Sequence, residues 1–245
     1  MDFRNPFHLP NRRQDRDPAD PEELPRQRRG VTPQMHGRYP DWDVLAEADH
    51  WDEKTREVVL RRVDDPPSIR FFRGDEVETL KAFCDVVTHQ YREPRIPVLA
   101  FVDEKLFEGR LDGYQYADMP DDRDTWRIVA RGLDHSARTE WRAESFAAAP
   151  TTVREDIVRT LKAGNLRGGP WDELNVERAW KVTTRHVVEA FYAHPWSWNE
   201  IGFGGPAYPR GYMRLHTGPT GREPYEAEEA FGLDPVTDVQ RRGLE

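Results

Sequence analysis

The alternation of apolar and polar residues predicts a mainly α-helical chain. Between residues 75 and 191, apolar side chains recur three and four positions apart, the spacing that places them on one face of a helix. Asn175 is a candidate cap for the last helix, and Pro195 is expected to end it. The pattern predicts helices over 75–87, 97–109, 122–141, 151–164 and 175–195.

The chain on either side of these helices is patterned differently. Asp43 is a candidate cap for a short helix, and residues 56–63 fit a short strand that ends at the turn signal of residues 65–67. Both ends of the chain are rich in charge and turn-forming residues and are too polar to build a core, so they are expected to form extended, disordered or loosely held arms. The first arm either stays solvated or wraps over the domain or a partner. The predicted organisation is a charged arm over 1–42, a helix/strand lead-in over 43–70, a single helical domain over 71–215 and a tail over 216–245.

Large aromatic rings gather among glycines and prolines in the segment 194–215. Such a segment fits neither a regular helix nor a central strand, so we expect a rigid loop. Trp, Tyr and Arg are enriched at the energetic centres of protein interfaces, and a rigid loop loses little entropy on binding. Two interpretations stay open, since the rings either pack inward as core or form a docking surface. Both hold if Trp196 and Trp198 point inward while Tyr208, Arg210, Tyr212 and Arg214 point outward.

Composition narrows the classes of partner. Charged residues make up 33% of the chain and hydrophobic residues 37%, and the net charge of −9 argues against non-specific binding to nucleic acid or anionic membranes. No apolar run is long enough to span a bilayer. Neither early pair of arginines is followed by the apolar stretch of an export signal, so a cytoplasmic location is expected. The single cysteine, Cys84, excludes an internal disulfide and a site built from several cysteines.

No motif singles out a catalytic site or a bound cofactor. The glycines at 202–205 follow a helix, whereas a dinucleotide loop follows a strand and opens a helix. His194, at the end of the last predicted helix, is expected to cap a free carbonyl there. The alternative hypothesis is a stand-alone helical metalloenzyme with a carboxylate/His site, because side chains three or four positions apart share a helix face. Its candidate ligands are Glu47, His50, Asp85 and His89.

Residues 191–215, FYAHPWSWNEIGFGGPAYPRGYMRL, resemble the C-terminal signature of the gluconate 2-dehydrogenase subunit 3 family. Residues 71–106 are similar to the N-terminal helices of that family and to the proline-containing turn between them. The resemblance covers roughly residues 70–215. It implies contact or loop-shaping roles for Trp196, Trp198, Asn199, Glu200, Gly204, Gly205, Tyr208, Arg210 and Tyr212, and it implies no catalytic residue. The nine residues predicted to contact the partner are Trp196, Trp198, Asn199, Glu200, Phe203, Tyr208, Arg210, Tyr212 and Arg214.

The resemblance also implies a biological setting. Members of the family are small accessory subunits without a cofactor of their own. They accompany a larger FAD-dependent sugar or alcohol dehydrogenase or oxidase of the glucose–methanol–choline type, sometimes with a cytochrome c subunit that accepts the electrons. Family members often carry a twin-arginine export signal, whereas this sequence begins with a charged arm. The complex is therefore expected to stay in the cytoplasm or to leave it with a partner that bears the signal.

Overall fold

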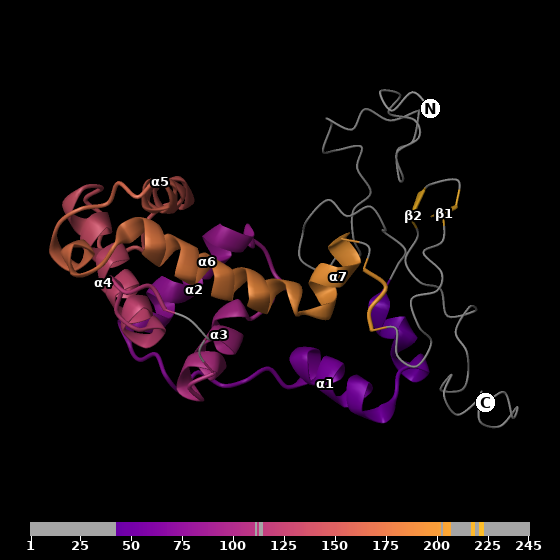
Figure 1. The fold of residues 1–245 in the computed structure, drawn as a ribbon. Helices are drawn as coiled ribbons and strands as arrows, with labels where there is room; N and C mark the ends of the chain where they lie inside the picture. Colours follow the sequence, from indigo (N-terminus) through magenta and orange to yellow (C-terminus); the bar gives the residue numbers. More distant parts are fainter. Residues whose placement is uncertain are drawn as a thin grey trace, which may run out of the picture. The chain divides into compact units, whose positions relative to one another are not determined.

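The computed structural model describes residues 43–110, 112, 115–201, 203–206, 217–218 and 221–222. In these residues the chain is a mainly α-helical domain, which confirms the predicted fold class (Figure 1). The arm predicted over 1–42 and most of the tail predicted over 216–245 lie outside the described residues. Contacts between Cα atoms group the chain into two compact units. The central unit consists of the described residues within 66–91 and 97–191, and the terminal unit takes in the other described residues.

The central unit confirms the helices that the apolar spacing predicts. Within it, α2 packs against α3, α4 and α5, and α4 packs against α5 and the short 3-10 helix η3 (Figure 1). The side chain of Asn175 accepts a hydrogen bond from the backbone N–H of Arg178 at the start of α6, as expected of a helix cap (3.2 Å). The elements are α2 (Asp75–Thr88), α3 (Val98–Phe107), α4 (Asp122–Thr139), α5 (Thr151–Lys162), η3 (Gly169–Glu173) and α6 (Val176–Tyr192).

Helix α4 contributes many buried residues to the core of the central unit. The Trp126 ring is fully buried and meets the Phe83 ring of α2 edge-on, with 6.1 Å between the ring centroids. One helical turn and a half further along, Gly132 lets η3 approach, because a Cβ atom at this position would lie 2.5 Å from the Trp171 ring. The indole N–H of Trp171 donates to the hydroxyl of Ser136 (2.9 Å), so the buried ring leaves no polar atom unpaired.

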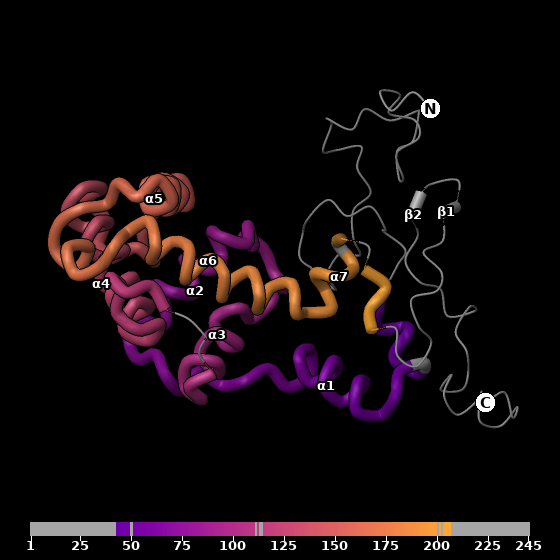
Figure 2. Tube along the Cα trace, viewed as in Figure 1, coloured from indigo at the N-terminus to yellow at the C-terminus, as the bar shows by residue number. Residues whose placement is uncertain are grey.

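The terminal unit is built from segments that are far apart in the sequence. Helix α7 packs against η2 and α1, and α1 also packs against η2. Figure 2 follows the chain from α6 through a short turn into α7. The elements are η2 (Val44–His50), α1 (Glu53–Asp64), α7 (Pro195–Ile201) and a minimal antiparallel ladder of β1 (Thr217–Gly218) with β2 (Gly221–Arg222).

The strand predicted over 56–63 is wrong, because these residues form helix α1. The side chain of Asp52 caps the helix by accepting from the backbone N–H groups of Lys54 (3.0 Å) and Thr55 (3.1 Å). A half-buried strand would bury every second residue, whereas α1 buries Val59 and leaves its charged residues partly or fully exposed. The short apolar run of residues 58–60 misled the prediction, since such runs fit a strand and a helix equally well.

Candidate functional site

The predicted aromatic loop begins with a helix. Pro195 is the first residue of α7 and does not merely end α6. Proline is well tolerated at the first position of a helix, because a backbone N–H there would have no partner within the helix. The ring nitrogen Nδ1 of His194 accepts from the backbone N–H of Trp196 (3.2 Å), and the His194 carbonyl accepts from the hydroxyl of Ser197 (2.7 Å). His194 therefore has a capping role, but at the start of α7 rather than at the end of α6.

Two residues of α7 fix the helix in the terminal unit. Trp198 is buried in an apolar cluster with Val44, Trp51 and Val59, and its indole N–H donates to the carbonyl of Tyr192 (2.7 Å). The side-chain oxygen of its neighbour, Asn199, accepts from the buried backbone N–H of Val44 (2.8 Å), and its amide group donates to the carboxylate of Asp43 (3.3 Å). The two residues thus hold α7 against η2, a segment far away in the sequence.

The glycine-rich turn after α7 packs against the same cluster. The Phe203 ring meets the Trp198 ring edge-on, with 5.3 Å between their centroids. Gly205 adopts a φ of +82°, and a Cβ atom there would lie 2.6 Å from Cγ2 of Val44. Any side chain at 205 would meet both a steric clash and an unfavourable backbone conformation. Glycine at 205 therefore shapes the turn, as the family resemblance implies.

The structure places the nine predicted contact residues in three groups. Trp198 and Asn199 are buried within the chain. Trp196 and Phe203 are half-buried. The side chain of Glu200 lies outside the description of the structure. Four predicted residues lie outside the described residues altogether: Tyr208, Arg210, Tyr212 and Arg214.

Sequence reasoning did not single out two exposed apolar side chains, one just before α7 and one at its end. Tyr192, just before the helix, is 43% exposed, and Ile201, its last residue, is 52% exposed. Large apolar side chains that are this exposed at the end of an ordered helix are suited to contact with another protein. Periodicity alone could not mark them, because the same spacing is expected of core residues.

Stability of the terminal unit is expected to fall as the pH drops below about 6.5. Burial lowers the pKa of His194 from its ordinary value to about 4, and a hydrogen bond with the backbone of Arg62 offsets only part of this effect. Between these two pKa values the unfolded chain binds a proton that the folded chain does not, so acid favours unfolding. The expected loss between pH 7 and pH 4 is about 3 kcal/mol.

Urea unfolding of the wild type and of His194→Gln over this pH range checks the expectation. Glutamine keeps a hydrogen-bonding side chain but does not titrate, so the variant should lose stability with falling pH less steeply than the wild type. Equal pH dependence of the two proteins would show that His194 is not the responsible group.

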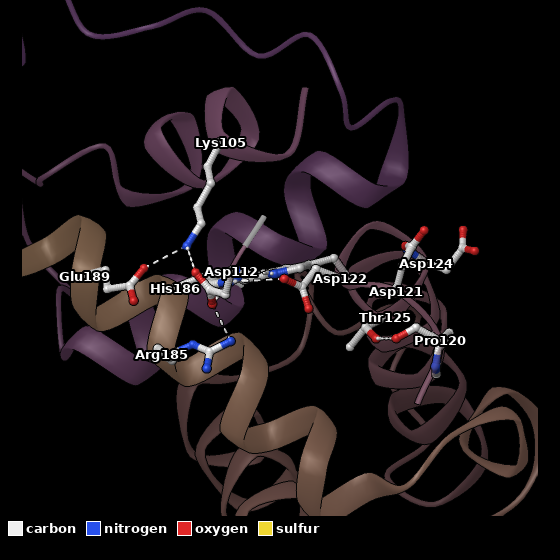
Figure 3. Close-up of polar contacts among 11 residues, drawn as sticks. Lys105, Asp112, Pro120, Asp121, Asp122, Asp124, Thr125, Arg185, His186 and Glu189 are labelled. Atoms are coloured by element: carbon white, nitrogen blue, oxygen red, sulfur yellow. Dashed lines mark hydrogen bonds and ion pairs between the residues drawn. The ribbon is translucent and has the colours of Figure 1, made fainter. Parts of the chain in front are cut away.

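A cluster of charged side chains around a histidine lies in the central unit, with members from α3, α4, α6 and the connection between α3 and α4 (Figure 3). The Lys105 ammonium contacts the carboxylates of Asp112 (3.0 Å) and Glu189 (2.9 Å). Asp112 also pairs with the guanidinium of Arg185. The Nε2 atom of the fully buried His186 lies 3.4 Å from Oδ2 of Asp112 and 3.6 Å from Oδ2 of Asp122.

The surroundings of the two aspartates shift their pKa values in opposite directions. Burial raises the pKa of Asp112, but the hydrogen bond and charge of Lys105, with the charge of Arg185, outweigh it and leave the pKa below its usual value. The pKa of Asp122 is raised, chiefly by burial. Burial and then the nearby Lys105 charge lower the pKa of His186, which therefore stays neutral at pH 7.

The predicted metal ligands do not form this cluster. Asp112, Asp122 and His186 are the one group of three carboxylate or histidine side chains with metal-ligand spacing in the described part of the chain. The hypothesis of a site around Glu47, His50, Asp85 and His89 is thus not supported by the spacing of these side chains. His89 instead ends α2 in a left-handed conformation and meets the Tyr91 ring edge-on, and the His50 side chain lies outside the described residues.

The single cysteine is not a reactive nucleophile. Cys84 is buried in α2, and burial raises the pKa of its thiol well above the ordinary value. It therefore remains protonated at neutral pH and serves as a small core residue.

The described residues thus define a helical protein with a partly exposed ion-pair cluster around a buried histidine and an anchored aromatic end. Residues 74–205, more than half of the chain, match the family model described as Gluconate 2-dehydrogenase subunit 3. The chain belongs to the gluconate 2-dehydrogenase subunit 3 family. No curated protein and no solved structure matches it.

The family assignment confirms the resemblance drawn from residues 70–215. The match runs from the residue before α2 to the glycine that packs against the α7 cluster. Because the family is that of a dehydrogenase subunit, membership implies a multi-subunit dehydrogenase as partner. Among the described residues, no helix has the length and apolar character needed to cross a membrane.

Proposed function

We propose that this chain is a non-catalytic accessory subunit that binds and stabilises an FAD-dependent sugar or alcohol dehydrogenase or oxidase large subunit. In this proposal the partner holds FAD and the substrate, and the accessory chain holds no cofactor. A cytochrome c subunit is a further candidate member of the complex, and the complex works in the cytoplasm. The match of residues 74–205 to a dehydrogenase-subunit family is the observation that carries the proposal.

We place the docking surface on the segment 194–215. The hydrogen bonds of Trp198 and Asn199 hold the described part of this segment in one shape before any partner arrives. A surface that is already ordered loses less entropy on binding, so more of its contact energy is available for affinity. Tyr192, just before the segment, and Ile201, within it, expose apolar area, while Trp198 keeps the helix in place rather than contacting the partner.

A charge placed on this surface is expected to weaken the complex. Ile201→Asp should raise the dissociation constant for the large subunit by about 30-fold, since burying an unpaired carboxylate at an interface centre costs about 2 kcal/mol or more. Val188→Asp is a matched control, because Val188 on α6 of the central unit is also an apolar residue of similar exposure, at 40%. It should change the affinity less than threefold.

The measurement uses the accessory chain produced together with an FAD-dependent large subunit chosen by gene neighbourhood. The intact chain should elute with the large subunit as one complex that contains bound FAD, and titration calorimetry should give the affinities of the two variants. No co-elution by the intact chain would contradict the accessory role. Equal weakening by both variants would place the docking surface elsewhere.

A further inference from the structure

The buried contact between α4 and α6 fixes the tautomer of His186. The indole Nε1 of Trp126 lies 3.1 Å from Nδ1 of His186, and both rings are buried. An indole N–H only donates, so Nδ1 must be the acceptor. A neutral imidazole that accepts at Nδ1 carries its proton on Nε2. Nε2 of His186 lies near the carboxylates of Asp112 and Asp122 (Figure 3), so the N–H group is presented to these two aspartates.

Among the described residues, this N–H group has no acceptor in good hydrogen-bond geometry. Nε2 of His186 is buried and lies 3.4 Å from Oδ2 of Asp112 and 3.6 Å from Oδ2 of Asp122. Both distances are longer than that of an ordinary N–H···O hydrogen bond. One atom from each of the three side chains lies within 4.8 Å of the others. A buried donor in a folded protein is nearly always paired, so this arrangement points to a bound group that completes it.

We propose that His186, Asp112 and Asp122 bind a single ordered water molecule. The water accepts from Nε2–H of His186 and donates its two protons to the two carboxylates, so that each of its three contacts has the required polarity. Buried waters typically make about three hydrogen bonds to polar groups that would otherwise be unpaired. Through these hydrogen bonds the water would link α6 to the first turn of α4 and to Asp112 in the connection between α3 and α4.

The same geometry argues against a metal ion. Coordination by Nε2 needs its lone pair, and the remaining proton would then sit on Nδ1, facing the N–H group of Trp126. Two cations, Lys105 and Arg185, already pair with Asp112 and would repel a third. The occupant must therefore be a neutral group that accepts one hydrogen bond and donates two.

Nuclear magnetic resonance of the ¹⁵N-labelled full chain at pH 7.5 tests the proposal. The His186 ring should carry its proton on Nε2, and this proton should show cross-relaxation with a long-lived water and exchange at least tenfold more slowly than the ring protons of the exposed His89. Asp122→Leu should remove the water signal, because leucine fills the space without accepting a hydrogen bond. A proton on Nδ1, or an Nε2 proton without a water contact in the wild type, would overturn the proposal.

Metal titration supplies the second arm. Zn²⁺, Mg²⁺ and Ca²⁺ added separately should leave the His186 resonances unchanged. Stoichiometric binding of any of them that is lost in His186→Gln would replace the water with a metal centre. These readouts concern the isolated chain, so they are independent of whether the chain docks on a flavoprotein.

Discussion

Asp103→Ala is expected to lower the free energy of unfolding by about 4 kcal/mol. The Asp103 carboxylate is fully buried in α3 and accepts from three consecutive backbone N–H groups. Those of Arg70 (2.6 Å), Phe71 (2.9 Å) and Phe72 (2.9 Å) converge on it, so one side chain satisfies the whole turn that leads into α2. Alanine would remove the acceptor of all three bonds and leave these backbone N–H groups without a partner, the one of Phe72 in a buried position.

Urea unfolding of three variants separates this role from the mere loss of a charge. Asp103→Asn keeps one acceptor oxygen but turns an amide group toward a backbone N–H, so it should cost about half as much as alanine. Glu108→Ala, at the exposed end of the same helix, should change stability by about 0.5 kcal/mol or less. Equal stability of Asp103→Ala and Glu108→Ala would show that the three backbone bonds contribute nothing net.

The helices of the central unit were predictable because each buries a regular stripe. Trp126, Val129, Leu133 and Ala137 recur along α4 at three- and four-residue spacing, and all four are buried in the structure. This pattern needs no partner to be recognised, since the period of the helix alone decides which residues share a face. Predictions of this kind therefore held from α2 to α6.

The terminal unit was less predictable because its stability comes from distant segments. Helix α7 is short and rich in rings, and it is fixed by an Asn199 side chain that bonds η2. No local propensity reveals that contact, as a short helix is stabilised by tertiary packing rather than by its own sequence. For the same reason α1, whose one fully buried residue is Val59, resembled a strand.

The candidate site at His186 was out of reach for a related reason. Its two carboxylates come from the connection before α4 and from the first turn of α4, while His186 lies on α6. Acidic residues in the first turn of a helix are ordinarily explained by the helix dipole, so Asp122 has a simpler explanation in the sequence. The tautomer of His186 depends on Trp126, and only the fold brings these two rings together.

Trp198→Ala is expected to destabilise the terminal unit by about 4 kcal/mol. The substitution would empty the centre of the cluster formed with Val44, Trp51 and Val59, and would remove the hydrogen bond to the Tyr192 carbonyl. It would also remove the ring over which the Arg62 guanidinium lies, at 5.8 Å from the ring centroid. Hydrogen exchange of the α1 and α7 backbone amides measures the loss of protection directly.

Two companion variants decide whether this tryptophan is core or interface. Trp198→Phe keeps most of the ring and should lose about 1 kcal/mol through the missing hydrogen bond, with affinity for the large subunit changed less than about threefold. Trp196→Ala, two residues away on the same helix but half-buried, should lose less stability than Trp198→Ala and more affinity than Trp198→Phe. The reverse order would make Trp198 the residue that contacts the partner. A core ring is buried when the chain folds, whereas an interface ring is buried only when the partner binds. If α7 is ordered before binding, substitution of Trp198 should therefore lower mainly the stability, and substitution of Trp196 should lower mainly the affinity.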